Sequence, residues 1–300
     1  MALASQTQTA APGSVATTEL TAEQVLTTLI QPLEAASQFL AAGPRIIDTA
    51  GPVRIPKMGG ATSPSWHGEN EQITEVDPTF DELHLLPSTM ESIKTLTRYS
   101  NELARQSVVA LDAAIKQRLV KDVADTMDAQ LFSAGGDGVT RPRGIFAYAG
   151  TQTVAVDGEL TLDHLLDAQG LAMAANVNLE RTKWVLTSRE FINLRKVKDA
   201  DGRYLITPDA TQAGAYRLFG VPVLVTNRVP DTTGASPTGR AALVDFSQVV
   251  VARDLAPSVK VLDQTFAAHD QQAIRVVYRL DAAPANPEAI IKLTGITIPA

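Results

Sequence analysis

The amino-acid sequence predicts a mixed α+β fold that is organised around one long helix. Residues 100–133 contain neither proline nor glycine, and apolar residues recur four apart along them, which is typical of a helix. Before this stretch, residues 51–99 alternate apolar and polar side chains on both sides of a turn-rich middle, which is typical of paired strands. After it, helical and strand-like segments alternate, and the chain ends in strand-like runs. Helices and sheets are therefore expected to share the domain.

The composition limits the class of protein. The 300 residues are 45% hydrophobic and 20% charged, which suits one large domain or two smaller ones with a sizeable core. No cysteine is present, so disulfides and thiolate chemistry are excluded. The formal net charge of -7 argues against binding nucleic acid through the bulk of the surface. No apolar run is long enough to span a bilayer, and the N-terminus lacks the pattern of a secretory signal.

The N-terminal residues are predicted to form an arm. Residues 1–18 are rich in Ala, Thr, Gln, Ser and Gly and carry no charged side chain, which indicates a flexible segment. Residues 19–40 have helical periodicity, which Pro32 limits or kinks. An open linker follows. Because this helix and linker have no core of their own, we expect them to lie on a neighbouring molecule.

Residues 51–99 are predicted to form a long two-stranded ribbon. Val53, Ile55 and Lys57 alternate with their neighbours, a turn-rich stretch follows, and the run PTFDELHLLP alternates again. An isolated ribbon is marginally stable in water, and its exposed edges usually end up paired or covered. The outer half has few large apolar residues, so the ribbon is expected to rest on another subunit.

Residues 100–133 are predicted to form a single helix about 50 Å long. Ser100 is placed to cap its first turn, Glu102 follows where the helix dipole favours a carboxylate, and Gly135 and Gly136 end it. Opposite charges lie four apart on the other side, as at Arg118 and Asp122. A coiled coil is the weaker alternative, because the apolar row steps by four instead of alternating three and four. That row consists of Leu111, Ile115, Leu119, Val123, Met127 and Leu131.

The second half of the chain is predicted to contain a compact lobe followed by a sheet. Residues 160–175 read as an amphipathic helix, TKWVLTS as a strand, and Ser188 as the cap of the helix REFINLRKVK. LFGVPVLVTN reads as a strand broken by a Gly-Val-Pro bend, and DTTGASPTGR as a surface loop. The remaining strand-like runs are AALVDF, QVVVAR, SVKVLD, QAIRVVYRL and EAIIKLTGITI.

Residue patterns for catalysis or metal binding are weak. The histidines His67, His84, His164 and His269 lie far apart without ligand spacing, and no serine has a GxSxG context. The Gly136-Asp137-Gly138 run lacks the third glycine of a dinucleotide loop. Residues 48–51, DTAG, resemble a magnesium-side motif of GTPases, but no GxxxxGK[ST] precedes them.

Two further pairs of charged residues are more simply structural. Asp81 and Glu82 are adjacent on a strand and so point to opposite faces, which is the wrong geometry for acid–base partners. Arg141 and Arg143 have the chemistry to bind phosphate, but pairing with carboxylates at a subunit contact is favoured. We therefore predict no catalytic, cofactor-binding or metal-ligating residue and no cofactor, and the chain is not expected to be an enzyme.

Several motifs in a fixed order resemble one known family. They are VRIPKMGGATSPSWHGENEQITEVDPTFDELHLLP, the Ser-capped TRYSNELARQS, LFSAGGDGVTRPRGI, WVLTSREFINLRKVKDADGRYL, FGVPVLVTN and YRLDAAPANPEAIIKLTGI. Their order and spacing, from about Ala22 to Ile298, resemble the major capsid proteins of tailed bacteriophages with the Hong Kong 97 fold. Each motif alone is weakly specific.

The resemblance implies a division of the chain into four parts. Residues 1–50 would be the N-terminal arm, and 51–99 the extended loop (E-loop) that lies over the adjacent subunit. Residues 100–159 and 248–287, including the spine helix 100–133, would form the peripheral domain. Residues 160–247 and 288–300 would form the axial domain. The implied function is self-assembly, as hexamers and pentamers, of the icosahedral shell that encloses packaged double-stranded DNA without sequence-specific binding.

The resemblance also implies partners and a location. A separate scaffolding protein, a portal and a decoration or cement protein are candidate partners, and no membrane is expected. The location would be the virion capsid, assembled in the host cytoplasm. Because the arm starts almost at Met1, any scaffold is expected to be a separate protein or absent. Some family members cross-link their E-loop through a lysine and an asparagine, but Lys57 lies near the ribbon base, so no cross-link is expected.

Three alternatives remain open at the level of sequence. An encapsulin, the shell of a protein nanocompartment, has the same fold, and particle contents would distinguish it. A soluble hydrolase with an α+β core is disfavoured because no nucleophile and base occur together. Another virion component, such as a tail or head-joining protein, is disfavoured by the order of ribbon and spine.

Overall fold

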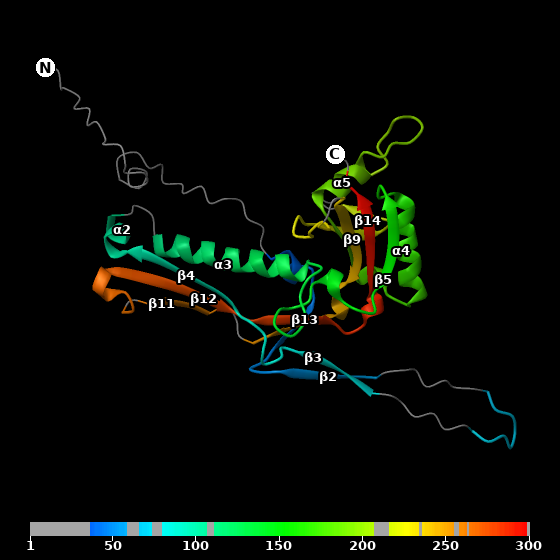
Figure 1. Ribbon diagram of the computed structural model, residues 1–300. Helices are drawn as coiled ribbons and strands as arrows, with labels where there is room; N and C mark the ends of the chain where they lie inside the picture. Colours follow the sequence, from blue (N-terminus) through cyan, green and yellow to red (C-terminus); the bar gives the residue numbers. More distant parts are fainter. Residues whose placement is uncertain are drawn as a thin grey trace. The chain divides into compact units, whose positions relative to one another are not determined.

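The computed structural model describes residues 37–58, 66–73, 80–106, 111–206, 216–233, 236–254, 258–262 and 264–298 (Figure 1). Residue contacts divide the chain into two compact units. The smaller unit contains Lys94–Asp122 and Pro257–Val277, and the larger contains Ala35–Ile93, Val123–Ala256 and Tyr278–Ala300. Of the predicted arm helix over residues 19–40, residues 19–36 lie outside the described residues.

The smaller unit is built on a three-stranded sheet in the order β11-β12-β4. Its strands are β4 (Ile93–Ser100), β11 (Ser258–Leu262) and β12 (Gln271–Tyr278). β11 and β12 run antiparallel, and the short helix η4 (Ala267–His269) lies in their connection. The Tyr99 hydroxyl donates a hydrogen bond to Gln272 Oε1 at 3.1 Å, which ties β4 to β12.

The predicted cap of the long helix is present at Ser100. Ser100 Oγ accepts a hydrogen bond from the Glu102 N–H at 3.2 Å, at the start of α2 (Asn101–Gln106). α3 (Leu111–Leu131) follows, whereas residues 107–110, on which the continuity of the helix depends, lie outside the described residues. The C-terminal part of the predicted apolar row is confirmed by four buried residues spaced four apart, whereas Ile115 is half-buried. These four are Leu119, Val123, Met127 and Leu131. Arg118 and Asp122 form the predicted ion pair, 3.0 Å apart.

The larger unit contains a six-stranded sheet in the order β5-β14-β9-β6-β8-β7. Its strands are β5 (Gln152–Gly158), β6 (Thr182–Leu186), β7 (Arg217–Leu218), β8 (Val221–Val225), β9 (Thr238–Asp245) and β14 (Ile290–Thr297). α4 (Leu162–Ala174) and α5 (Ser188–Arg195) cover one face of it. Leu165 of α4 and Phe191 of α5 pack there against Trp184 of β6 in one buried cluster.

Two smaller sheets complete the larger unit. One has the order β1-β10-β13, with β1 (Arg45–Asp48) parallel to β10 (Val249–Arg253) and β13 (Leu280–Pro284) antiparallel to it. The other is the predicted ribbon, in which β2 (Val53–Met58) pairs antiparallel with β3 (Phe80–Leu85). The short helices are α1 (Gln38–Ala41), η1 (Ile145–Ala147), η2 (Leu179–Arg181), η3 (Phe246–Gln248) and η5 (Pro287–Ala289).

The structure corrects several expectations. Strands β1, β5 and β13 were not predicted. The helix α5 is capped by Thr187, whose hydroxyl accepts from the Glu190 N–H, because Thr187 has the extended backbone of a cap and Ser188 is already helical. The break in LFGVPVLVTN is a tight turn at Phe219 and Gly220, which have φ of 50° and 81° and join β7 to β8.

The expectation that the arm's linker has no core of its own is also wrong for residues 37–48. Phe39 is fully buried, and its ring lies 5.3 Å from that of Phe132 and 5.6 Å from that of Phe246. β1 then joins the sheet of β10. No helix in the described ranges is both long enough and apolar enough to cross a membrane.

Candidate assembly surfaces

The base of the β2–β3 ribbon is anchored in the larger unit. The strands pair in register from Val53 opposite Leu85 to Met58 opposite Phe80. Leu85 and Leu86 are buried together with Val250 and Ala252 of the β1-β10-β13 sheet. The ribbon therefore begins from a fixed apolar base, which sets the direction in which its strands leave that sheet.

A buried carboxylate and a guanidinium stabilise the turn that follows β3, at Leu86 and Pro87. Asp281 Oδ2 accepts a hydrogen bond from the Leu86 N–H at 2.9 Å, and Leu86 has the left-handed φ of 57°. Arg279 donates to the Pro87 carbonyl at 2.7 Å and forms an ion pair with Asp254 at 3.3 Å. Burial raises the pKa of Asp281, and the two N–H groups that it accepts from oppose that shift. The turn thus depends on charged groups away from water.

The outer part of the ribbon exposes large apolar side chains. Trp66 is 102% exposed, Ile73 75% and Phe80 72%. Arg54 forms an ion pair across the ribbon with Glu82 at 3.6 Å, and Lys57 stands opposite Asp81 in the pairing register. Apolar side chains exposed to this degree are characteristic of surfaces that become buried in an assembly.

Residues 37–41 are fixed at the C-terminal half of α3. Ser37 Oγ donates to Asp128 Oδ1 at 2.8 Å, and the Gln38 N–H donates to Asp128 Oδ2 at 2.6 Å. Asp128 is only 2% exposed, and burial raises its pKa. A carboxylate at this position accepts from the first N–H group of α1 and so fixes where that helix begins.

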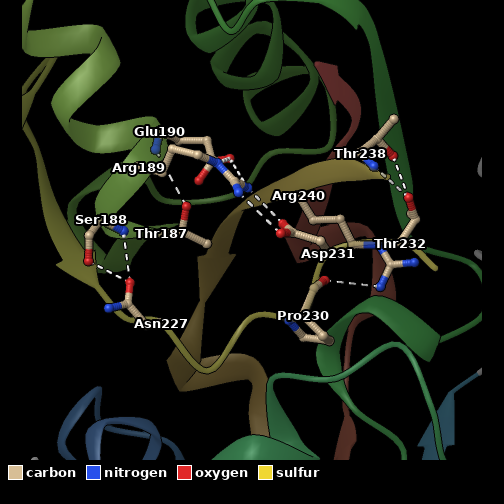
Figure 2. A network of polar contacts seen from close by, with 10 residues as sticks. All are labelled: Thr187, Ser188, Arg189, Glu190, Asn227, Pro230, Asp231, Thr232, Thr238 and Arg240. Carbon is tan, nitrogen blue, oxygen red and sulfur yellow. Dashed lines mark hydrogen bonds and ion pairs between the residues drawn. The ribbon is translucent and has the colours of Figure 1, made fainter. Parts of the chain in front are cut away.

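A polar network holds the described residues 226–233 against the start of α5 (Figure 2). Arg189 donates to both oxygens of Asp231, at 2.7 and 3.1 Å, and also to Glu190 Oε1 at 2.8 Å. These acceptors raise the pKa of Arg189. Within the loop, the Thr232 and Thr238 hydroxyls lie 2.9 Å apart. Two-point contacts of this kind fix both the distance and the orientation of the loop.

Glu190 is closely packed within this network. Glu190 is 2% exposed, and a Cβ atom at Gly239 would come within 2.4 Å of its Oε1 atom. Ser188 Oγ and the Ser188 N–H both contact Asn227 Oδ1 at the other end of the loop. The described part of this loop is therefore tied to the start of α5 through Asn227 and Asp231.

The histidines singled out in the sequence are dispersed. His84 lies 3.6 Å from Glu82, His67 lies 4.0 Å from Glu71, and His164 completes the capping box of α4 with Thr161. His269 lies in η4. Among the residues that the structure describes, no group of three or more His, Asp or Glu is placed to hold a metal ion.

The charged motifs have structural contacts within the chain. Asp48, of the DTAG run, pairs with Arg253 at 2.6 Å, and this contact lowers the pKa of Asp48. Arg141 lies 3.4 Å from Glu91, and Arg143 donates to the Asp137 carbonyl at 3.0 Å. The carboxylate partner of Arg141 is thus in its own chain, not in a neighbouring subunit as the sequence predicts.

Sequence reasoning missed the charged residues that organise these surfaces. Asp128, Glu190 and Asp281 are nearly fully buried, although charged side chains are usually exposed. Nothing in the local sequence distinguishes Glu190 and Asp281 from surface carboxylates. The one available signal is for Asp128, which lies beside the apolar row of α3 at Met127 and Leu131.

Comparison with known proteins gives a consistent result. Residues 19–295 match the phage capsid family. The chain is 23% identical over 269 residues to the major capsid protein of Klebsiella oxytoca phage phiKO2, which covers 82% of this chain and 60% of that protein. The chain therefore spans less than two thirds of the length of that curated relative.

Solved structures share the fold. A chain of the capsid of a native GTA particle aligns with a TM-score of 0.75 at 20% identity, covering 96% of this chain and 100% of that chain. A chain from Microbacterium phage Oxtober96 aligns with a TM-score of 0.71 at 17% identity, covering 91% and 96%. A chain from Mycobacterium phage Bobi aligns with a TM-score of 0.67 at 16% identity, covering 91% and 95%.

Proposed function

This chain belongs to the phage capsid family, and from that premise we propose that it is the major capsid protein of a tailed phage. In this role, copies of the chain assemble into the closed shell that encloses double-stranded DNA. The match over residues 19–295 is the observation that carries the proposal. The likeness to the phiKO2 major capsid protein supports it.

The geometry of the ribbon supports assembly. Its base is anchored through Leu86 and Asp281, whereas Trp66, Ile73 and Phe80 are exposed. A subunit with a core of its own does not need such an extension for its stability. In a permanent assembly such an extension has a purpose, because obligate interfaces typically bury about 2,000 Å² or more. An outstretched element provides this contact area without enlarging the core.

We further propose the division of the family's Hong Kong 97 fold for this chain. Residues 1–50 act as the arm and 51–99 as the E-loop. Residues 100–159 and 248–287 form the peripheral domain, and 160–247 and 288–300 the axial domain. Asp231, which Arg189 holds at the start of α5, belongs to the proposed axial domain, and a surface fixed in this way suits the repeated contact around a ring axis.

The proposed partners follow from this role. Hexamers and pentamers of the chain form an icosahedral shell in the virion, assembled in the host cytoplasm. A separate scaffolding protein, a portal and a decoration protein are the expected accessory partners. The net charge of -7 suits a wall that encloses DNA without holding it by counterion release.

Electron microscopy of the expressed, purified chain tests the proposal. We expect closed particles of uniform size at high protein concentration. Nuclease-resistant DNA in particles from phage-infected cells supports a phage capsid, whereas a folded enzyme as cargo supports a nanocompartment shell. A chain that stays monomeric at high concentration, with or without a co-expressed scaffold, overturns the proposal.

A further inference from the structure

The three-stranded β11-β12-β4 sheet has an unusual distribution of charge. Its 21 strand residues include four cations and no aspartate or glutamate, in a chain whose net charge is -7. The cations are Lys94, Arg98, Lys260 and Arg275, and all four are exposed. None of them forms an ion pair with a described residue. We call this set the basic sheet face.

The pairing register places these cations on one side of the sheet. Lys260 of β11 stands directly opposite Arg275 of β12, so their side chains share a face. Tyr99 and Gln272 hydrogen-bond to each other, which assigns them to the opposite face. Because side chains alternate along a strand, Lys94 and Arg98 lie on the same face as Arg275. Like charges directly opposite each other destabilise a sheet, so this arrangement costs stability unless an acidic partner covers it.

The basic sheet face is not only charged. Leu96 lies between Lys94 and Arg98 on β4 and is 52% exposed. Arg98 lies over the Phe266 ring, 5.1 Å from its centroid. A partner that matches this surface combines carboxylates with large apolar side chains. A DNA backbone provides phosphates but would leave the leucine without an apolar contact.

Residues 66–73 at the end of the ribbon have the complementary chemistry. The segment WHGENEQI carries Glu69 and Glu71, both exposed, and contains no lysine or arginine. Trp66 and Ile73, at its two ends, are the apolar side chains exposed to 102% and 75%. Glu71 Oε2 accepts from the Gly68 N–H at 2.8 Å, which gives this tip a defined local turn. We call residues 66–73 the acidic tip.

We infer that the basic sheet face of one copy binds the acidic tip of a second copy. Glu69 and Glu71 of the acidic tip form ion pairs with cations of the basic sheet face. An apolar side chain of the tip covers Leu96. This inference rests on the proposed function, because it names the surface on which the ribbon of a neighbouring subunit lies. It adds electrostatic recognition, so that two oppositely charged elements select the register of the contact.

Charge reversal on both sides tests the inference. In the full chain, Lys260→Glu with Arg275→Glu, or Glu69→Lys with Glu71→Lys, should each reduce the yield of closed particles at least about tenfold. A chain carrying all four substitutions restores opposite charges at the contact and should recover the yield to within about threefold of wild type. Arg181→Glu with Arg203→Glu, on exposed residues of the larger unit, is the matched control and should leave the yield unchanged.

The outcomes separate the alternatives. Failure of the fourfold variant to recover, while circular dichroism shows each unassembled variant folded, overturns the inference. Particles of normal yield that retain less DNA in the Lys260→Glu, Arg275→Glu variant also overturn it, since they assign the basic sheet face to nucleic acid. If wild-type chains form no particles, the proposed function itself fails, and this result is recognisable without any variant.

Discussion

At the scale of single residues, Asp281 connects the ribbon to the larger unit. Its carboxylate is the acceptor for the Leu86 N–H, and both groups are buried. We predict that Asp281→Ala lowers the free energy of unfolding by about 1–3 kcal/mol, because it leaves a buried donor unsatisfied. Chemical denaturation of the unassembled chain measures this, and hydrogen exchange at Leu86 should accelerate. Asp167→Ala, on the exposed side of α4, is the control and should change stability by less than about 0.5 kcal/mol.

Asp128 gives stability a defined dependence on pH. Burial raises its pKa above the ordinary 3.8, so the folded chain retains this proton at pH values where the unfolded chain has lost it. In that window the unfolded state binds fewer protons, and the contribution of Asp128 to stability therefore falls as pH rises. Above the folded pKa the contribution is constant.

We predict that Asp128→Asn gains stability relative to wild type as pH rises from about 4 through the folded pKa of Asp128. The amide keeps an acceptor for the Gln38 N–H and offers a donor to Ser37 Oγ, while the buried charge is removed. Unfolding free energies of both chains, measured from pH 4 to 7, give the difference. If the difference in unfolding free energy does not change with pH, or if it favours wild type more as pH rises, the raised pKa of Asp128 is contradicted.

At the scale of elements, the turn after α3 requires close backbone packing at Gly144. A Cβ atom there would come within 2.1 Å of the Ser133 carbonyl oxygen, and backbone cannot move away as a flexible side chain does. Gly144→Ala should therefore destabilise the chain by more than about 1 kcal/mol. Gly170→Ala is the matched control, because nothing lies within 4 Å of its Cβ position in α4, and it should stabilise by about 0.4–1 kcal/mol. Thermal unfolding of both variants checks the opposite signs.

The tip of the ribbon is expected to contribute to assembly but not to the folding of the single chain. Deletion of residues 59–72 removes all of the acidic tip except Ile73 but leaves β2, β3 and the contacts of Leu86 and Asp281 in place. We predict a chain that folds with near wild-type stability but forms no stable shell. Circular dichroism measures the first property and electron microscopy the second. Normal particles from the deletion variant would show that the ribbon tip is dispensable.

At the scale of the whole molecule, we predict that the proposed shell is held by non-covalent contacts. The chain contains no cysteine, and Lys57 is the only lysine of the ribbon before Lys94. Lys57 stands opposite Asp81 in the paired strands, not at the tip. Boiled shells should therefore run on a denaturing gel as one band at the 31.9 kDa of the single chain. A ladder of covalent multimers would refute this.

Several elements could be predicted from sequence because their signal is local. The apolar row of α3, the alternation of β2 and β3, and the amphipathic pattern of α4 each repeat with the period of their own backbone. For the same reason the absence of recognisable catalytic spacing and the order of the capsid-like motifs were visible without coordinates. The proposed role in a shell follows from that order and from family membership.

The sequence by itself therefore determined the α+β class, the ribbon and the family, whereas the tertiary structure alone decided the pairings and the buried charges. β1 was missed because its partner, β10, lies about two hundred residues away, and the short run RIID gains its strand conformation from that pairing. The cap of α5 shifted from Ser188 to Thr187 because a cap is defined by backbone geometry. Asp281 and the Arg189–Asp231 contact were not foreseen because a charge is buried only where distant segments supply its partners.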